Sequence, residues 1–168
     1  MPHLPAKYRN SKLAIIVIFV LGLLIGIFVG YIVRPSDGTV VTESEFETAI
    51  VSQVVDGDTV VLEDGRTVRY LGIDTPEDGE PYSIEATEKN REFVEGKAVE
   101  LQQGIRDIDE YDRILRYVYV DGIFVNAELL AQGYATAFIF DPDERFSQIL
   151  VQLEQYAKVS NKGMWDSE

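Results

Sequence analysis

The longest apolar stretch of the chain lies near its N-terminus. Residues 13–33 are 21 consecutive positions without a charged side chain, and the segment is apolar on every helical face. As a helix it would be about 31 Å long, which matches a bilayer core of about 30 Å. A buried core helix and a cleaved signal peptide are the alternatives, but the run exceeds the roughly 7–15 apolar residues of a signal peptide. The pattern therefore predicts a transmembrane signal-anchor helix.

Basic residues before this segment predict its orientation. Lys7, Arg9 and Lys12 lie within residues 1–12, whereas residues 34–45 are polar, turn-rich and soon acidic. By the positive-inside rule, we expect residues 1–12 to be a cytoplasmic tail and residues 34–45 to be a linker on the other side. The rest of the chain is then extracytoplasmic, held at the cell membrane by a single pass, or secreted if the anchor is cleaved.

Glycine recurs within the same apolar segment. Gly22, Gly26 and Gly30 stand at every fourth position and give two overlapping GxxxG patterns. Small residues at this spacing let two helices approach closely in a bilayer. The pattern allows a homodimer through this face, although glycine is common in membrane spans for other reasons.

Beyond residue 45 the apolar positions follow strand-like and helix-like patterns. Asp64-Gly65 separates two runs rich in β-branched residues, which is a strong β-hairpin signal. A helix is predicted over 83–95, with Ser83 as its N-cap and Gly96 after its end. The predicted strands span 48–55, 59–62, 67–73, 98–102 and 114–120, with a short extended run at 135–140.

Two further helices are expected towards the C-terminus. Asn126 is expected to cap a short helix that ends near Gly133, and Gly163 ends the last helix. Successive strands joined by tight turns indicate an antiparallel sheet, and about five strands that must hide their edges suggest a small closed barrel. The predicted class is α+β, mainly β, in one domain over 46–168. The stripe of the last helix comprises Phe146, Ile149, Leu150, Leu153 and Tyr156.

Composition narrows the chemistry that this domain can perform. The chain has no cysteine, and its one histidine is His3 in the tail. Disulfide scaffolds, cysteine nucleophiles, Ser–His–Asp triads and histidine-ligated zinc are therefore excluded or strongly disfavoured. Catalysis would have to use carboxylates, arginines, tyrosines and a hard metal ion.

The net charge disfavours a polyanionic partner at long range. The chain carries −14 overall, and the part after residue 34, with 11 basic and 29 acidic residues, carries −18. A surface this acidic repels nucleic acid unless local groups neutralise the backbone charge.

Three short segments concentrate candidate chemistry: 56–59, 69–77 and 111–113. Each alone has a plainer interpretation, as a turn, a helix start or a solvated salt bridge. Together, carboxylates at the ends of adjacent strands can meet at one barrel edge and select Ca²⁺ or Mg²⁺. Two arginines can hold a phosphate, and Glu77, three residues after Asp74, can orient a water. These are the parts needed to attack a phosphodiester.

At these segments the sequence resembles the staphylococcal nuclease-like (thermonuclease) family. The strings that carry the resemblance are VVDGDTVVL, RYLGIDTPE, EYDRILRYVYVDG, VNAELLAQGYA and a closing MW, in the family's order and at similar spacing. The resemblance implies a five-stranded oligonucleotide/oligosaccharide-binding (OB) barrel with three helices. It also implies Ca²⁺-dependent hydrolysis of single-stranded DNA and RNA that leaves 3′-phosphate ends.

The same resemblance implies a metal site. Asp58 and Asp74 correspond to the side-chain Ca²⁺ ligands, and the backbone carbonyl of Thr75 completes the protein's share. Asp56 corresponds to a residue that supports these ligands without binding the ion.

It further implies the catalytic and substrate-binding residues. Glu77 corresponds to the general base or the residue that positions the attacking water. Arg69 and Arg113 correspond to the groups that bind the scissile phosphate and stabilise the transition state. Tyr111 would hydrogen-bond a substrate phosphate.

Some positions depart from the family pattern. Glu110 stands where a lysine is frequent, and Phe138 and Phe140 replace two tyrosines that line the base-binding pocket. The phenyl rings can still stack on bases, or they can simply pack in the core. The leading hypothesis is thus a membrane-anchored Ca²⁺-dependent nuclease. The alternatives are a non-catalytic OB-fold module that binds nucleic acid or protein, and a domain that docks a protein through its acidic face.

Overall fold

The computed structural model describes residues 46–139 and 145–166. The predicted tail 1–12, the apolar segment 13–33 with its glycine repeat and the linker 34–45 lie outside these described residues. Within the described residues, no helix has both the length and the apolar content needed to cross a bilayer. All of the described residues belong to one compact unit of the chain.

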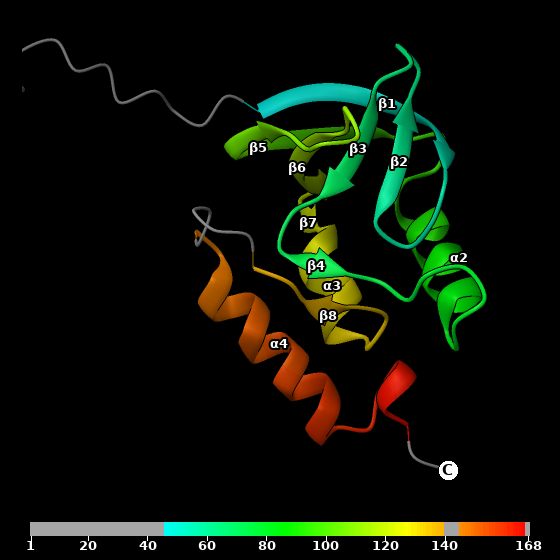
Figure 1. Ribbon diagram of the computed structural model, residues 1–168, viewed down its shortest axis with the longest axis vertical. Helices are drawn as coiled ribbons and strands as arrows, with labels where there is room; N and C mark the ends of the chain where they lie inside the picture. The colour runs from blue at the N-terminus through cyan, green and yellow to red at the C-terminus, as the bar shows by residue number, and fades with distance from the viewer. Residues whose placement is uncertain (1–45, 140–144, 167–168) are drawn as a thin grey trace, which may run out of the picture. The chain divides into compact units, whose positions relative to one another are not determined.

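Five strands close into a barrel (Figure 1). Their order is β3-β2-β1-β5-β6, and an additional pairing of β3 with β6 joins the two edges, so that both edges are paired. The expected five-stranded, mainly β barrel of the OB type is therefore confirmed. The strands are β1 (Phe46–Val54), β2 (Thr59–Leu62), β3 (Thr67–Tyr70), β5 (Ala98–Ile108) and β6 (Ile114–Val120).

The hairpin pairings agree with the turn signals in the sequence. β2 and β3 pair antiparallel around Gly65, whose φ of 88° lies in the left-handed region that glycine favours. β5 continues to Ile108, beyond the predicted end at 102, because it pairs with β6 as far as Ile114. The closing pair, β3 and β6, is parallel rather than antiparallel, with Arg69 opposite Leu115.

A break at Gly72 divides the strand predicted over 67–73. β3 ends two residues earlier, and β4 (Ile73–Asp74) pairs instead with β8 (Thr136–Ala137). Gly72 has a φ of 77°, and a Cβ there would lie 2.4 Å from Cδ1 of Leu150. The prediction of one continuous strand is therefore wrong, because the backbone turns at Gly72 and carries β4 to a second, two-stranded sheet.

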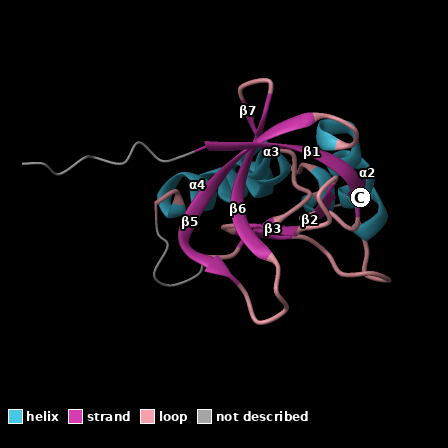
Figure 2. Cartoon of the chain, turned by 90° about the horizontal axis from the view of Figure 1, so that it is seen from above, coloured by secondary structure: helices cyan, strands magenta, loops and turns pink. Residues whose placement is uncertain are grey.

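Three α-helices pack on the barrel within the described residues (Figures 1 and 2). Gly96 follows the first of them with a φ of 72°, as predicted. Ser83 does not cap that helix: the cap position falls on Tyr82, which has a φ of 69° and makes no side-chain capping bond. The helices are α2 (Ser83–Val94), α3 (Val125–Ala131) and α4 (Ser147–Val159), followed by a 3₁₀ turn, η2 (Gly163–Trp165).

Asn126 has a structural role other than the predicted cap. It lies inside α3 and is fully buried. Its Nδ2 donates to the carbonyl of Leu71 at 2.8 Å, and its Oδ1 accepts from the N–H of Val118 at 2.9 Å. The amide therefore ties α3 to β6 and to the chain between β3 and β4, which satisfies polar groups that would otherwise be buried without partners.

The predicted stripe of α4 holds only in part. Leu150 is fully buried, and Phe146 and Leu153 pack against the core. Ile149 and Tyr156 are instead 45% and 51% exposed. The main core lies inside the barrel and beneath the helices and includes Val51, Val60, Val68, Leu101, Val118, Leu129, Leu130 and Leu150.

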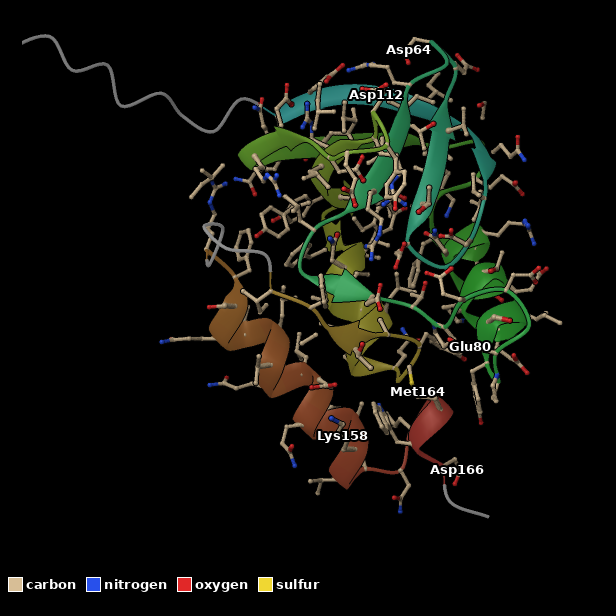
Figure 3. The ribbon with its side chains drawn as sticks, viewed as in Figure 1. Asp64, Glu80, Asp112, Lys158, Met164 and Asp166 are labelled. Atoms are coloured by element: carbon tan, nitrogen blue, oxygen red, sulfur yellow. The ribbon has the colours of Figure 1, made fainter. Side chains whose placement is uncertain are left out.

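The chain after α4 is fastened to the turn that follows α3. The N–H of Met164, labelled in Figure 3, donates to the carbonyl of Gly133 at 2.9 Å. A Cβ on Gly133, whose φ is 79°, would lie 2.1 Å from the carbonyl oxygen of Lys162. Only glycine permits this close approach of two backbone segments without rearrangement.

Candidate active site

Asp58 is the most enclosed of the predicted site residues. It stands just before β2 and is 4% exposed. Its Oδ2 accepts from both the N–H and the hydroxyl of Thr75, at 2.9 and 3.1 Å. Gly57 permits this contact, because a Cβ there would lie 2.7 Å from the Thr75 side chain. The Asp-Gly-Asp turn thus places one carboxylate directly against the end of β4.

The charge on Asp58 is only partly compensated. Burial raises the pKa of its carboxyl group from 3.8 to about 6, although Arg69 and the hydrogen bonds from Thr75 act to lower it. Its Oδ1 also accepts from the hydroxyl of Thr59 at 3.2 Å. A carboxylate that remains costly to ionise despite these donors favours a further positive charge beside it.

Arg69 joins the two predicted metal ligands. Its side chain is 9% exposed, and its Nε lies 3.1 Å from Oδ1 of Asp58 while one Nη lies 2.7 Å from Oδ1 of Asp74. Its other Nη donates to the carbonyls of Tyr70 and Ile73, at 2.7 and 2.8 Å. All three nitrogens of the guanidinium therefore have protein partners, but the Nη bonded to Asp74 keeps a second N–H that can donate to a phosphate.

Asp74 lies at the solvent side of the same ion network. Its side chain is 47% exposed. Its backbone is held in β4 opposite Thr136, whose hydroxyl donates to the Asp74 carbonyl at 3.3 Å. Solvent can therefore reach Asp74 from one side, whereas Asp58 is enclosed.

The donor set fits a hard divalent cation in chemical type. Asp58 and Asp74 supply carboxylate oxygens, and water can reach Asp74 to complete a coordination shell. Asp56 supports the turn, since its Oδ1 accepts from the N–H of Asp58 at 3.0 Å. Within residues 46–139 and 145–166, however, no group of three carboxylate, histidine or cysteine side chains converges as a metal cage. An ion here would depend on Asp58, Asp74, backbone and water.

Arg113 lies in the turn that directly precedes β6. β3 and β6 run parallel with Arg69 opposite Leu115, so Arg113 stands two positions before the residue that pairs with Arg69. The Nε of Arg113 lies 2.7 Å from Oδ2 of Asp109, and its Cζ lies 5.3 Å from the ring centre of Tyr111. Among the described residues, neither Nη of Arg113 has a hydrogen-bond partner. This arginine is held at one edge and keeps its phosphate-binding fork available.

The loop between β5 and β6 is shaped to present Arg113. Figure 2 shows this loop directed away from α3 and α4. Asp109 accepts from the N–H groups of Tyr111 and Arg113, at 2.9 and 3.0 Å. Burial acts to raise the pKa of Asp109, but the backbone and guanidinium of Arg113 outweigh it and hold that pKa below its ordinary value. Asp112 completes the turn with a φ of 61°, in the left-handed region that aspartate adopts more often than most residues other than glycine.

Glu77 is not brought into contact with the other site residues. It is exposed, in the loop before α2, and its N–H donates to Oε2 of Glu80 at 2.9 Å. Figure 3 marks Glu80 beside α2. No hydrogen bond joins the Glu77 carboxylate to Asp58, Asp74 or Arg113 in the described part of the chain. Its predicted role stays a prediction.

The predicted substrate-binding aromatics are only partly described. Tyr111 is 72% exposed and packs against Arg113. Phe138 is 46% exposed, and its N–H donates to the carbonyl of Gly72 at 3.0 Å, so it lies beside the turn between β3 and β4. Both side chains are therefore partly exposed to solvent rather than confined to the core. Phe140 lies outside the described residues.

Two residues that support the site were not singled out from the sequence. Asn90 is fully buried, accepts from the Tyr70 hydroxyl at 2.9 Å and donates to the Asp56 carbonyl at 3.0 Å. The sequence feature that could have identified Asn90 is a polar residue four positions after Ala86, on the buried side of α2. Asp109, four residues before Arg113, gave only the weaker signal of one acid among several.

Comparison with known proteins identifies the family of the chain. The family model described as "Staphylococcal nuclease homologue" matches residues 67–167, which include Arg69, Asp74, Glu77 and Arg113 but begin after Asp58. The chain is 37% identical over 133 residues to the SPbeta prophage-derived endonuclease YokF of Bacillus subtilis, covering 72% of this chain and 45% of that protein.

Other relatives carry similar names. Endonuclease YncB of Bacillus subtilis is 36% identical over 127 residues, which cover 68% of this chain and 60% of the relative. Thermonuclease of Staphylococcus intermedius is 28% identical over 134 residues, covering 74% of this chain and 80% of the relative. The matched part thus spans about half the length of the two Bacillus proteins. Because the family model covers more than half of the chain and the barrel has the expected form, the chain belongs to the staphylococcal nuclease homologue family.

Proposed function

We propose that this chain is a nuclease, a hydrolase that cleaves phosphodiester bonds in single-stranded DNA and RNA. The observation that carries the proposal is the placement of Arg69 between Asp58 and Asp74, with the open guanidinium fork of Arg113 at the start of β6, the strand that pairs with the one carrying Arg69. Membership of the nuclease family and the names of the relatives support it.

Ca²⁺ is the proposed cofactor, held by the carboxylates of Asp58 and Asp74 and the carbonyl of Thr75. When bound, it supplies positive charge that stabilises the phosphate oxygens during attack. The half-exposed carboxylate of Asp74 lets the ion enter, and the buried carboxylate of Asp58 fixes its place. Asp56 keeps the turn in position through its bond to the Asp58 N–H.

The arginines bind the phosphate in different ways. Arg113 donates from both Nη nitrogens to phosphate oxygens, while Asp109 holds its Nε and sets the direction of the fork. Arg69 donates to the phosphate from the second N–H of the Nη that is bonded to Asp74, and keeps its bonds to the buried backbone carbonyls. Tyr111 donates from its hydroxyl to a neighbouring phosphate, and Phe138 and Phe140 stack on bases.

The reaction adds water across one phosphodiester bond. Glu77 accepts a proton from the attacking water, whose oxygen forms the new bond to phosphorus. The bond from phosphorus to the 5′ oxygen breaks, and that oxygen takes up a proton as it leaves. The products are a 3′-phosphate and a 5′-hydroxyl.

The test is cleavage of labelled single-stranded DNA and RNA by the full chain in detergent, with Ca²⁺ or with a chelator. We expect cleavage with Ca²⁺ only, 3′-phosphate ends on the products, and a large loss of rate in Glu77→Gln. Arg66→Ala is a control, since Arg66 is ion-paired to Glu47 and Asp64 away from the site. Cleavage that continues in the presence of the chelator would contradict the proposed role of Ca²⁺. Absence of cleavage under all conditions would contradict the nuclease function.

The engaged state of Arg69 favours one alternative. If Arg69 keeps these partners and donates no N–H to a phosphate in the presence of nucleic acid, the ion network is structural and the domain is a non-catalytic OB-fold binding module. Such a module would bind oligonucleotides without cutting them, and Ca²⁺ would not alter its affinity.

We further propose that residues 13–33 anchor the chain in the cell membrane with the catalytic domain outside. The uncharged length of this segment and the basic residues before it support the proposal. Protease treatment of intact cells is expected to remove the domain and to spare the tail. Crosslinking of the membrane-bound chain, with Gly26→Leu as the variant, tests for a dimer through Gly22, Gly26 and Gly30.

A further inference from the structure

A pocket of about 290 Å³ lies beside the candidate active site, between α2 and the turn that carries Asp58. None of the roles assigned above uses its interior. Its lining combines apolar and charged side chains from three segments of the chain. The lining residues that matter here are Val55, Asp56, Pro76, Asp78, Ile84, Glu88 and Arg91.

The pocket is continuous with the site. Asp56 contributes to its wall and also accepts from the N–H of Asp58 at 3.0 Å. Pro76, on another wall, directly follows Thr75, which donates twice to Asp58. Asp58 in turn contacts Arg69, so a nucleotide whose phosphate is bound by Arg69 would have its own or its neighbour's base beside this pocket.

The pocket is preformed rather than assembled by a ligand. Asn90, fully buried in α2, donates to the carbonyl of Asp56 at 3.0 Å and accepts from the Tyr70 hydroxyl. This bond fastens the helix to the turn and fixes the separation of two pocket walls. Binding of a ligand here therefore costs the protein little conformational entropy.

The walls suit a flat, uncharged ring. Val55 is 50% exposed and Ile84 is 72% exposed, and with Pro76 they present apolar surface to the pocket. Apolar side chains this exposed on an acidic protein are available to cover a planar group.

The charges of the pocket exclude a phosphate and favour a hydrogen-bond donor. The lining holds the carboxylates of Asp56, Asp78 and Glu88 against the single guanidinium of Arg91. Arg91 is already paired with Glu88 in α2 and with Glu95, which directly follows that helix. An anion would be repelled, whereas an amino group can donate to a carboxylate, as cytosine N4 does in nucleic-acid complexes.

We infer that this pocket binds the base of a nucleotide next to the scissile phosphate, and that it favours bases with an exocyclic amino group, which are adenine, guanine and cytosine. The inference rests on the proposed nuclease function. The ring lies against Val55 and Ile84, and its amino group donates to Asp78 or Glu88.

This subsite is separate from the predicted stacking residues. Phe138 follows β8 and lies beside Gly72, whereas the pocket adjoins α2. In Figure 1, α2 and α4 flank the β4–β8 pair on opposite sides, and the chain runs from β4 towards α2. The strand of nucleic acid would thus cross the site with one base near Phe138 and another in the pocket.

The experiment uses short single-stranded oligonucleotides with one hydrolysable linkage. The first pair of oligonucleotides differs only in the base on one side of that linkage, which is adenine in one and unsubstituted purine in the other. Purine has the same ring as adenine but lacks the amino group. The second pair makes the same change to the base on the other side of the linkage. We measure kcat/KM with the full chain and Ca²⁺, and measure binding of the same oligonucleotides with Ca²⁺ and Glu77→Gln.

On one side of the linkage, adenine is expected to exceed purine by about tenfold or more in kcat/KM and in affinity, as for a hydrogen bond to a charged group. Asp78→Asn is expected to reduce this ratio, and Ile84→Ala to weaken binding of both oligonucleotides about fivefold. Val159→Ala is the matched control, because Val159 is 74% exposed on α4, and it is expected to change neither quantity.

The outcomes separate the two proposals. Equal values for adenine and purine on both sides of the linkage, with cleavage intact, overturn the pocket assignment and leave the nuclease function standing. An Ile84→Ala variant that behaves like Val159→Ala also overturns it. A chain that cleaves no oligonucleotide and binds adenine and purine equally refutes the nuclease function and the subsite together. A chain that cleaves none but still distinguishes the two bases in binding refutes the nuclease function alone and supports the pocket within a non-catalytic module.

Discussion

Replacing Arg69 by alanine tests whether the ion network holds the site together. The substitution removes a 9% exposed guanidinium that contacts Asp58 and Asp74 and two backbone carbonyls. Loss of one partner from a buried ion pair costs about 3–5 kcal/mol, because the other charge stays buried without compensation. Water can solvate Asp74, which is 47% exposed, so the cost falls on Asp58. We therefore expect Arg69→Ala to lower the free energy of unfolding by about 3 kcal/mol, near the lower end of this range.

The assay is urea-induced unfolding of the full chain at neutral pH with a chelator present, followed by fluorescence of Trp165, the one tryptophan of the chain. Arg66→Ala is the matched control. Its side chain is 38% exposed and is paired with Glu47 and Asp64, so its pairs contribute less than about 1 kcal/mol each. Ca²⁺ is expected to restore part of the stability of Arg69→Ala, because the ion replaces the missing positive charge. If Arg69→Ala loses no more stability than Arg66→Ala, the network does not support the site as argued.

Three further predictions concern charge. Arg113→Ala is expected to reduce the rate of cleavage at least about 100-fold, as for other single donors to a transition state, and a loss under about threefold would make Arg113 a surface ion-pair partner. Because the part after residue 34 carries −18, moderate salt is expected to improve substrate binding, and activity that falls steadily from low salt upward would contradict this. The pKa of Asp58 is raised in the folded protein, so the stability that this group contributes below about pH 3.8 is lost as the pH rises through about 6. Without Ca²⁺, the free energy of unfolding of Asp58→Asn, relative to that of the parent chain, should therefore increase by up to about 3 kcal/mol from acidic to neutral pH, as measured by urea unfolding.

The barrel could be predicted because its signals are local. Asp64-Gly65 marks a hairpin by itself, and the β-branched runs on either side define β2 and β3. The turn at Gly72 could not be predicted in the same way. It depends on Leu150, which lies far along the chain and occupies the space that a Cβ would need. The same limit explains Asn126, whose partners on Leu71 and Val118 come from other segments.

The candidate site was predictable in its residue types but not in its contacts. The sequence favours carboxylates and arginines near one barrel edge, and the structure places Asp58, Arg69 and Asp74 in contact there. That every nitrogen of Arg69 has a protein partner depends on the path of the backbone from Tyr70 to Ile73, which no spacing rule gives. The exposed position of Glu77 likewise follows from the loop before α2.

The fastening of residues 162–164 to Gly133 has a consequence for the order of folding. The ribosome adds Met164 after every residue assigned to the site. While Met164 is still inside the exit tunnel, its N–H cannot donate to the carbonyl of Gly133, so this contact forms only at the end of synthesis.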